Sequence, residues 1–170
     1  MIEPQPTIGP ATIDDLAELA RLRWELYAEQ NGAHTEPFEA YVERFARFAR
    51  SALASDDWRA WVARTDDGLV GAMWLHTVHR VPVPGKHAGP IGYLTNVFIA
   101  PAHRNAGLGA QMLDRVKAWC GEEGFSLVIV WPTERSRSFY GRGGFDRPDE
   151  PLVLEIEPDE PLERSTGGGA

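Results

Sequence analysis

The stretch that decides the fold runs from Gly92 to Gln111 and reads GYLTNVFIAPAHRNAGLGAQ. Its first part, YLTNVFI, is an apolar run typical of a strand, and its end leads into LGAQMLDRVKAWC, whose apolar residues have helical spacing. Between the two runs lie one basic residue with a full charge, Arg104, and two near-adjacent glycines, Gly107 and Gly109, without an acid. Such a junction is either a plain turn into a helix or a cradle for a phosphate group.

Physical chemistry makes the second alternative reasonable. The first N–H groups of a helix have no partner within the helix, and the helix dipole is positive there, so anions are favoured. Without a Cβ at Gly107 and Gly109, the main chain can approach a ligand closely. The stretch lacks the third glycine of the dinucleotide fingerprint and the Gly-Lys-Ser/Thr of the nucleotide P-loop. Neither of those two cofactor classes is therefore indicated, and the turn and the cradle both stay open.

The composition predicts one globular domain, which we place over residues 1–160, followed by a mobile tail over 161–170. Of the 170 residues 43% are hydrophobic, yet no apolar run approaches the roughly 18 residues of a membrane span. The start, MIEPQPTIGP, has neither the basic nor the apolar region of a signal peptide, so we expect a cytoplasmic protein. The single cysteine, Cys120, lies in an apolar helical stripe and is expected to be a buried structural thiol.

The formal net charge of −8 argues against nucleic acid as the main partner, because binding to a phosphate backbone needs clustered Lys and Arg. A cationic small molecule or a basic peptide fits this charge better. The sequence leaves open whether the chain forms a homodimer.

Hydrophobic periodicity and turn signals predict a mixed α+β fold, a sheet between helices. Asp67 and Gly68 between two apolar runs indicate a hairpin, and Thr12 with Asp15 has the form of a capping box. The expected strands are 7–12, 58–64, 69–79, 92–99, 125–131 and 151–158, and the expected helices are 13–30, 38–53, 108–120 and 136–143.

About thirty residues after the glycines, beyond an apolar strand, stands SRSFYGRGGF, residues 136–145. The strand ending in VFIAP, then RNAGLGA, then FYxxxGF together resemble the GNAT superfamily of acetyl-coenzyme A-dependent N-acetyltransferases. The pyrophosphate-binding consensus of that family, Arg/Gln-x-x-Gly-x-Gly/Ala, is met by Arg104, Gly107 and Gly109. The order of elements resembles the family from about residue 6 to 157, and the specific motifs cover residues 97–145. The resemblance implies a central, mostly antiparallel sheet of about six to seven strands flanked by about four helices.

The resemblance also implies acetyl-coenzyme A as the co-substrate and assigns roles to residues. The main chain of Val97, Phe98 and Ile99 would pair with the pantetheine arm, and Tyr140 would protonate the departing thiolate. With a free pKa of about 10, a tyrosine stays protonated at neutral pH, although Tyr140 could equally be a core aromatic residue. The N–H groups around the pyrophosphate would come from a loop that Arg104 opens, at Asn105, Ala106, Gly107, Leu108, Gly109 and Ala110.

The general base stays unassigned, because the expected strand 92–99 carries no acid or histidine. Alternation of side chains would place Tyr93, Thr95 and Val97 on one face and Leu94, Asn96 and Phe98 on the other. An amine that loses its proton through a chain of water molecules is the alternative. The remaining candidates, which could instead be ordinary surface or core residues, are His34, Glu36, His76, His79 and Glu134.

No metal site is predicted. His76 and His79 are three residues apart on one expected strand, so their side chains would point to opposite faces and could not grip one ion.

Two functions follow from these observations. The first is an enzyme that transfers an acetyl group from acetyl-coenzyme A to a primary amine by direct attack in a ternary complex. The second, suggested by an intact cradle beside an unassigned base, is a non-catalytic module that binds acyl-coenzyme A. The sequence does not identify the amine.

Overall fold

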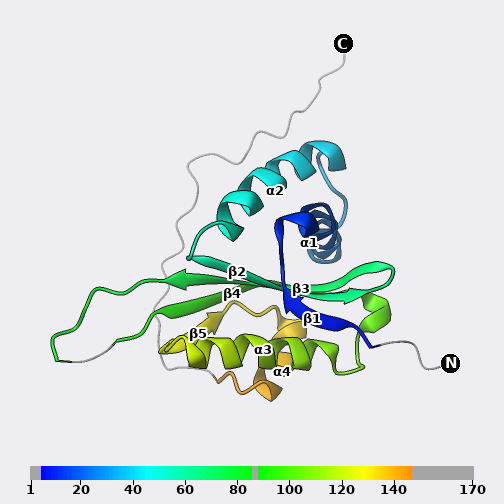
Figure 1. The fold of residues 1–170 in the computed structure, drawn as a ribbon. Helices are drawn as coiled ribbons and strands as arrows, with labels where there is room; N and C mark the ends of the chain where they lie inside the picture. Colours follow the sequence, from blue (N-terminus) through cyan, green and yellow to red (C-terminus); the bar gives the residue numbers. More distant parts are fainter. Residues whose placement is uncertain (1–4, 86–87, 147–170) are drawn as a thin grey trace, which may run out of the picture.

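The computed structural model describes residues 5–85 and 88–146 of the chain. Its centre is a five-stranded sheet in the order β1-β2-β3-β4-β5 (Figure 1). The first four strands are antiparallel to their neighbours, and β5 is parallel to β4. The strands are β1 (Thr7–Pro10), β2 (Trp58–Thr65), β3 (Gly68–Val78), β4 (Ile91–Ile99) and β5 (Leu127–Val130).

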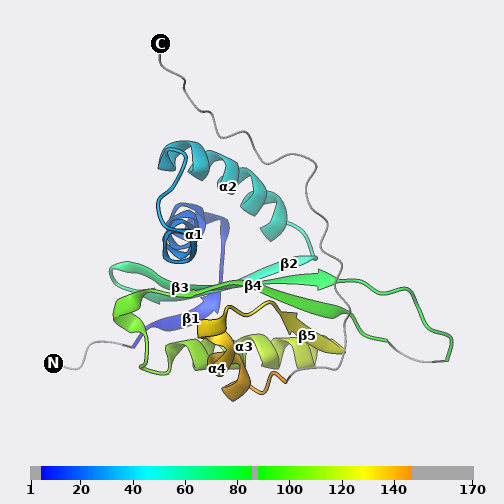
Figure 2. The ribbon, with the colours of Figure 1, turned by 180° about the vertical axis from the view of Figure 1, so that it is seen from behind.

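Helices cover both faces of the sheet. Helices α1 (Leu16–Asn31) and α2 (Phe38–Leu53) lie on one face, and α3 (Leu108–Glu122) and α4 (Arg137–Arg142) lie on the other (Figures 1 and 2). The predicted mixed α+β fold is therefore confirmed. The described strands number five, fewer than the about six to seven expected, and the predicted strand 151–158 and the tail 161–170 lie outside the described residues.

The start of α1 is fixed to the sheet by Asp15. This carboxylate accepts a hydrogen bond from the Thr12 main-chain N–H at 2.6 Å and completes the predicted capping box. It also accepts two hydrogen bonds from the Arg64 guanidinium on β2. The hydrogen bond from Arg64 is the main reason why the pKa of Asp15 is lowered.

Two apolar clusters hold the layers together. The first lies between the sheet and the α1/α2 layer and contains Trp74 of β3 and Phe98 of β4. The second lies between the sheet and the α3/α4 layer and contains Met73, Leu94 and Cys120. Cys120 is buried, as the sequence predicted. Burial of these side chains on both faces is what makes the sheet the core of the molecule.

The side-chain alternation predicted for β4 is wrong beyond Thr95, because the strand contains a β-bulge. Thr95 pairs with Trp74 and Phe98 with Ala72, so two residues of β4, Asn96 and Val97, oppose one residue of β3. Asn96 has φ = +49°, in the left-handed region that Asn tolerates better than most residues.

The extra residue shifts the pleat by one position. Leu94 and Val97 consequently pack on the α3/α4 side, and Phe98 packs on the α1/α2 side. A regular alternation would instead group Leu94 with Phe98, and Val97 with Thr95.

The pairing between β4 and β5 ends early. The parallel register runs from Ile91 opposite Leu127 to Leu94 opposite Val130, whereas β4 remains paired with β3 as far as Ile99. From Thr95 onward, the edge of β4 that would face β5 therefore has no neighbouring strand within the described parts of the chain. The sheet is split at this point.

Candidate active site

A cleft of about 1300 Å³ opens where β4 and β5 separate. Its walls come from both helical layers: from α1 on one side, and from α3 and the segment between β5 and α4 on the other. Pockets for one small ligand commonly measure about 300–1,000 Å³, so this cleft is larger than a typical pocket of that kind.

The cleft brings together most of the residues that the sequence singled out. Ala106 and Leu108 are the exceptions, because Ala106 is exposed and Leu108 is buried in the cluster beneath α3, and neither lines the cleft. The predicted residues that do line it are Val97, Phe98, Ile99, Arg104, Asn105, Gly107, Gly109, Ala110 and Tyr140.

The loop of residues 104–110 presents its main-chain N–H groups as a set. Asn105 (φ = +63°) and Gly107 (φ = +82°) are left-handed, and α3 begins directly after Gly107. The first main-chain hydrogen bond at the start of α3 is donated by the Gln111 N–H to the Gly107 carbonyl, at 3.0 Å. In the described parts of the chain, none of the N–H groups of residues 105–110 donates to a main-chain carbonyl. A left-handed residue followed by a helix is a geometry that binds anions.

Gly109 is needed for packing space rather than for an unusual φ. A Cβ at this position would lie 3.2 Å from Phe139 Cε2 and 3.6 Å from Ile99 Cγ1. A side chain at this position would therefore press on Phe139, which would have to shift for the first turn of α3 to keep its place beside β4 and α4. Two basic residues between the end of β5 and the end of α4, Arg135 and Arg142, line the same cleft, so the donor set fits a phosphate-bearing ligand.

The Arg104 side chain points away from these N–H groups. Its Nε donates to the Ile99 carbonyl at 2.7 Å, its Nη2 donates to Glu29 Oε1 at 2.6 Å, and the guanidinium lies over the Phe98 ring. The side chain thus joins the end of β4 to α1. Glu29 was not predicted, because it lies 75 residues before Arg104 and belongs to no local motif.

Tyr140 lies at the inner wall of the cleft and is 6% exposed. Its ring contacts Phe139 and Phe145, and its hydroxyl has no hydrogen-bond partner among the described residues. Burial raises the pKa of Tyr140 to about 12, so the phenol keeps its proton well above neutral pH.

None of the base candidates named from the sequence lines the cleft. Each has another partner: His34 stacks on Trp24, His76 stacks on Trp58, and the other three form polar pairs, which are Glu36 with Arg44, His79 with Asp57 and Glu134 with Arg137. Two acids do line the cleft among the described residues, Glu29 and Asp114.

Trp131, directly after β5, is a further residue of the cleft that the sequence did not single out. It lines the cleft, is 60% exposed, and meets Tyr93 edge to face with ring centroids 5.1 Å apart. An exposed tryptophan at the mouth of a cleft offers a flat surface to a ligand. Its position at the end of a predicted strand was the only available signal.

Similarity to known proteins agrees with this geometry. An aminoglycoside N(6')-acetyltransferase type 1 from Stenotrophomonas maltophilia is 29% identical over 125 residues, which is 73% of each chain. The crystal structure of a predicted acetyltransferase with acetyl-CoA from Clostridium acetobutylicum superposes with a TM-score of 0.75 at 21% identity, over 88% of this chain and 96% of that one. A structure of the aminoglycoside N-acetyltransferase AAC(6')-Iy in complex with CoA gives a TM-score of 0.69 at 17% identity, over 92% and 98%.

At these identities the two structures show the fold. The sequence itself also matches the profile of the acetyltransferase (GNAT) family over residues 16–145. This range includes the separated strands β4 and β5, the 104–110 loop and α4. The chain belongs to the acetyltransferase (GNAT) family.

Proposed function

We propose that this protein transfers the acetyl group of acetyl-coenzyme A to a primary amine of a small molecule. The observation that carries the proposal is the cleft at the split of the sheet, with the N–H groups of residues 105–110 at one side of it. The names of related proteins support a small-molecule amine, since the Stenotrophomonas relative is an aminoglycoside acetyltransferase. A protonated amine is also a cation, in keeping with the net charge of −8.

Acetyl-coenzyme A supplies an activated thioester, and this chain supplies the groups that hold it. The N–H groups of the 104–110 loop would donate to the pyrophosphate, with Arg135 and Arg142 adding positive charge. The unpaired edge of β4 from Val97 to Ile99 would bond the amide groups of the pantetheine arm, as a further strand would.

In the proposed reaction the amine nitrogen bonds to the carbonyl carbon, and the bond from that carbon to sulfur breaks. The amine proton leaves through water, because no histidine lines the cleft among the described residues, and Glu29, one of its two acids, is held by Arg104. The Tyr140 hydroxyl gives its proton to the departing thiolate and regains one from solvent. A phenol with a pKa of about 12 stays neutral until charge develops on the sulfur, as a general acid must.

The alternative is a module that binds acyl-coenzyme A without catalysis. One observation favours it: within the described ranges, the cleft has no histidine and no carboxylate that is free of an ion pair.

Release of free thiol from acetyl-coenzyme A separates the two functions. The assay uses a panel of primary amines that includes an aminoglycoside, with mass spectrometry to identify the acetylated product. We expect turnover with at least one amine above the rate without amine. Tight coenzyme A binding without turnover of any amine would identify the binding module instead, and absence of both would refute both functions.

A further inference from the structure

Arg23 of α1 carries a buried nitrogen that has no hydrogen-bond partner in the described parts of the chain. Its Nη1 is the one buried side-chain nitrogen or oxygen without a hydrogen-bond partner among residues 5–85 and 88–146. The Arg23 side chain also lines the cleft. Buried polar groups are nearly always hydrogen-bonded, and a charged group without a partner is more costly than a neutral one.

Neighbouring arginines are fully partnered. Arg21 bonds Glu18, Glu25 and the Leu69 carbonyl, and Arg104 bonds Glu29 and the Ile99 carbonyl. Arg23, in contrast, has no ion pair, hydrogen bond or stacked ring in the part of the chain that the structure describes. The nearby Tyr41 hydroxyl feels the positive charge of Arg23, but a phenol is not a counter-charge.

The position of Arg23 separates it from the phosphate-binding side of the cleft. Residues two apart on an α-helix point in nearly opposite directions, about 200° from each other. Arg21 points to Leu69 of β3, so Arg23 extends to the other side of α1. Helix α1 lies across the sheet from α3, whose first turn presents the N–H groups of residues 105–110 (Figures 1 and 2).

The same cleft is also lined by Tyr93, Thr95 and Trp131. Thr95 and Tyr93 pair with Trp74 and His76 of β3, so their side chains share the sheet face that α1 covers. A molecule bound there would lie next to the unpaired edge of β4, on the opposite side from the coenzyme's phosphates. This is the part of the cleft left for the acceptor.

We propose that Arg23 binds an anionic group of the acceptor, so that the preferred acceptor is a small amine that also carries a carboxylate, as an amino acid does. This inference rests on the proposed function and narrows its substrate class. A guanidinium presents two parallel N–H groups that match a carboxylate, and the bound carboxylate would supply a counter-charge that Arg23 does not have among the described residues.

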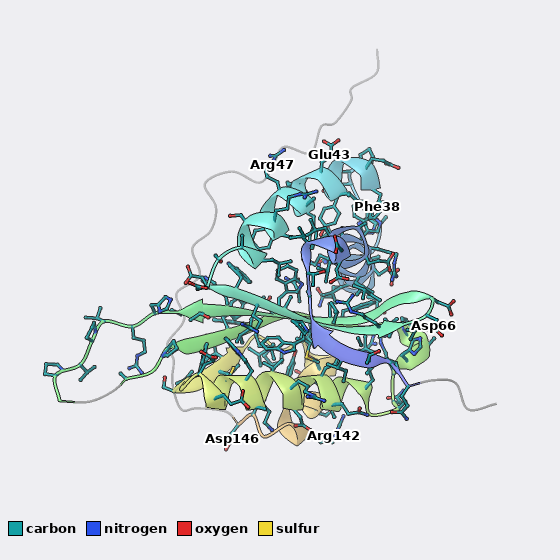
Figure 3. The ribbon with its side chains drawn as sticks, in the orientation of Figure 1. Phe38, Glu43, Arg47, Asp66, Arg142 and Asp146 are labelled. Carbon is teal, nitrogen blue, oxygen red and sulfur yellow. The ribbon has the colours of Figure 1, made fainter. Side chains whose placement is uncertain are left out.

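The test compares matched acceptors in matched variants. Three amino acids of increasing size are each assayed against their own amides, which keep the amine and the shape but lose the negative charge. The proteins are the wild type, Arg23→Gln, Arg23→Lys and Arg47→Gln. Arg47 is an exposed arginine of α2 that does not line the cleft and points away from the sheet (Figure 3), so it controls for the loss of one positive charge.

We expect the wild type and Arg47→Gln to prefer the acid over the amide by about tenfold or more in kcat/KM, mainly through KM. Arg23→Gln should lose this preference, and Arg23→Lys should keep part of it. Arg23→Gln should also unfold at the same temperature as the wild type or higher, because it removes a guanidinium nitrogen that is buried without a hydrogen-bond partner among the described residues. A lower melting temperature with an unchanged acid preference would mean that Arg23 is structural, and would overturn the proposal.

Binding distinguishes failure of this inference from failure of the proposed function. Calorimetry measures each acid against the complex with coenzyme A. If no amine is turned over but the wild type binds the acid and Arg23→Gln does not, catalysis is refuted and the role of Arg23 is upheld. If amines are turned over with the same acid-to-amide ratio in the wild type and Arg23→Gln, the role of Arg23 is refuted and catalysis stands.

Discussion

Tyr140 and Cys120 show how one environment sets the chemistry of two different side chains. Both belong to the apolar cluster between the sheet and the α3/α4 layer, and burial raises the pKa of both. For Tyr140, which also reaches the cleft, the result is a phenol that keeps its proton. For Cys120, which lies away from the cleft, the result is a thiol that does not ionise at neutral pH.

Removing the Tyr140 hydroxyl tests its proposed role directly. Tyr140→Phe keeps the ring and its contacts with Phe139 and Phe145, so coenzyme A affinity and thermal stability should change little. General acid catalysis is worth about 10²–10⁴-fold, and we expect a loss of kcat in this range, because the interaction strengthens only as charge develops on sulfur. Steady-state kinetics would measure it, and a fall below about threefold would leave Tyr140 as a core aromatic residue.

Cys120 should be almost inert to thiol reagents in the folded protein. Burial raises the pKa of its thiol to about 11, and only the thiolate is a good nucleophile. At about pH 8 the reaction with a disulfide reagent should be slow and should accelerate sharply once denaturant unfolds the chain. Rapid labelling of the native protein at this pH would show that the helix around Cys120 opens readily.

Single residues could be predicted from the sequence where they belong to a local motif. Gly107, Gly109 and Tyr140, which line the cleft, could be singled out because each stands at a fixed spacing within one short segment. Arg23, Glu29 and Trp131 were missed because they meet the cleft only through folding, from elements with no shared pattern. The direction of the Arg104 side chain was equally hidden, since it depends on Glu29 in a distant helix.

Whole elements were easier to predict than single contacts. The aromatic stripe of α2 predicted a helix over 38–53, and the structure has the same bounds. The bulge in β4 could not be predicted, because one extra residue leaves no mark in the apolar pattern of the strand. The early end of the β4–β5 pairing could not be predicted either, because it depends on how two strands distant in the sequence separate in the fold.

The junction between the 104–110 loop and α3 is the element to which the proposed function assigns coenzyme binding. Gly109→Val would bring its side chain against Phe139 and Ile99, so we expect the first turn of α3 to shift and its N–H groups to lose their arrangement. We expect coenzyme A affinity, measured by calorimetry, to fall by about tenfold or more, while the melting temperature falls by only a few degrees.

A second glycine of the same helix provides the control. A Cβ added at Gly121 would meet no neighbouring atom within 4 Å, so Gly121→Val should leave coenzyme A affinity unchanged. Unchanged affinity in folded Gly109→Val would contradict the assignment of the loop to the pyrophosphate.

At the scale of the molecule, net charge and cleft charge differ. The chain carries −8, yet the cleft is lined by Arg23, Arg104, Lys117, Arg135 and Arg142 against Glu29 and Asp114. We therefore expect the net negative charge to act on an acceptor from a distance, and the basic residues of the cleft to act at contact. No helix in the described parts of the chain is long and apolar enough to cross a membrane.

Ionic strength should separate these two effects. For a simple cationic amine, apparent KM should rise as salt increases, because the Debye length falls from about 30 Å at 0.01 M to about 8 Å at 0.15 M and screens the attraction. For an amino acid, which has no net charge, KM should change much less. Kinetics of both probes over this range check the prediction, and a flat response of the cationic amine would mean that the surface charge does not guide substrate.

The bulge at Asn96 also decides which helical layer each later side chain of β4 faces. Because β4 has one residue more than β3 at this point, odd and even positions exchange sides halfway along the strand. If the same residues formed a regular strand without the bulge, the perfect two-residue repeat would send Phe98 to the α3/α4 side and Ile99 to the α1/α2 side. One extra residue thus acts like a change of reading frame. Phe98 reaches the α1/α2 cluster and Ile99 reaches the α3/α4 cluster only because of that shift.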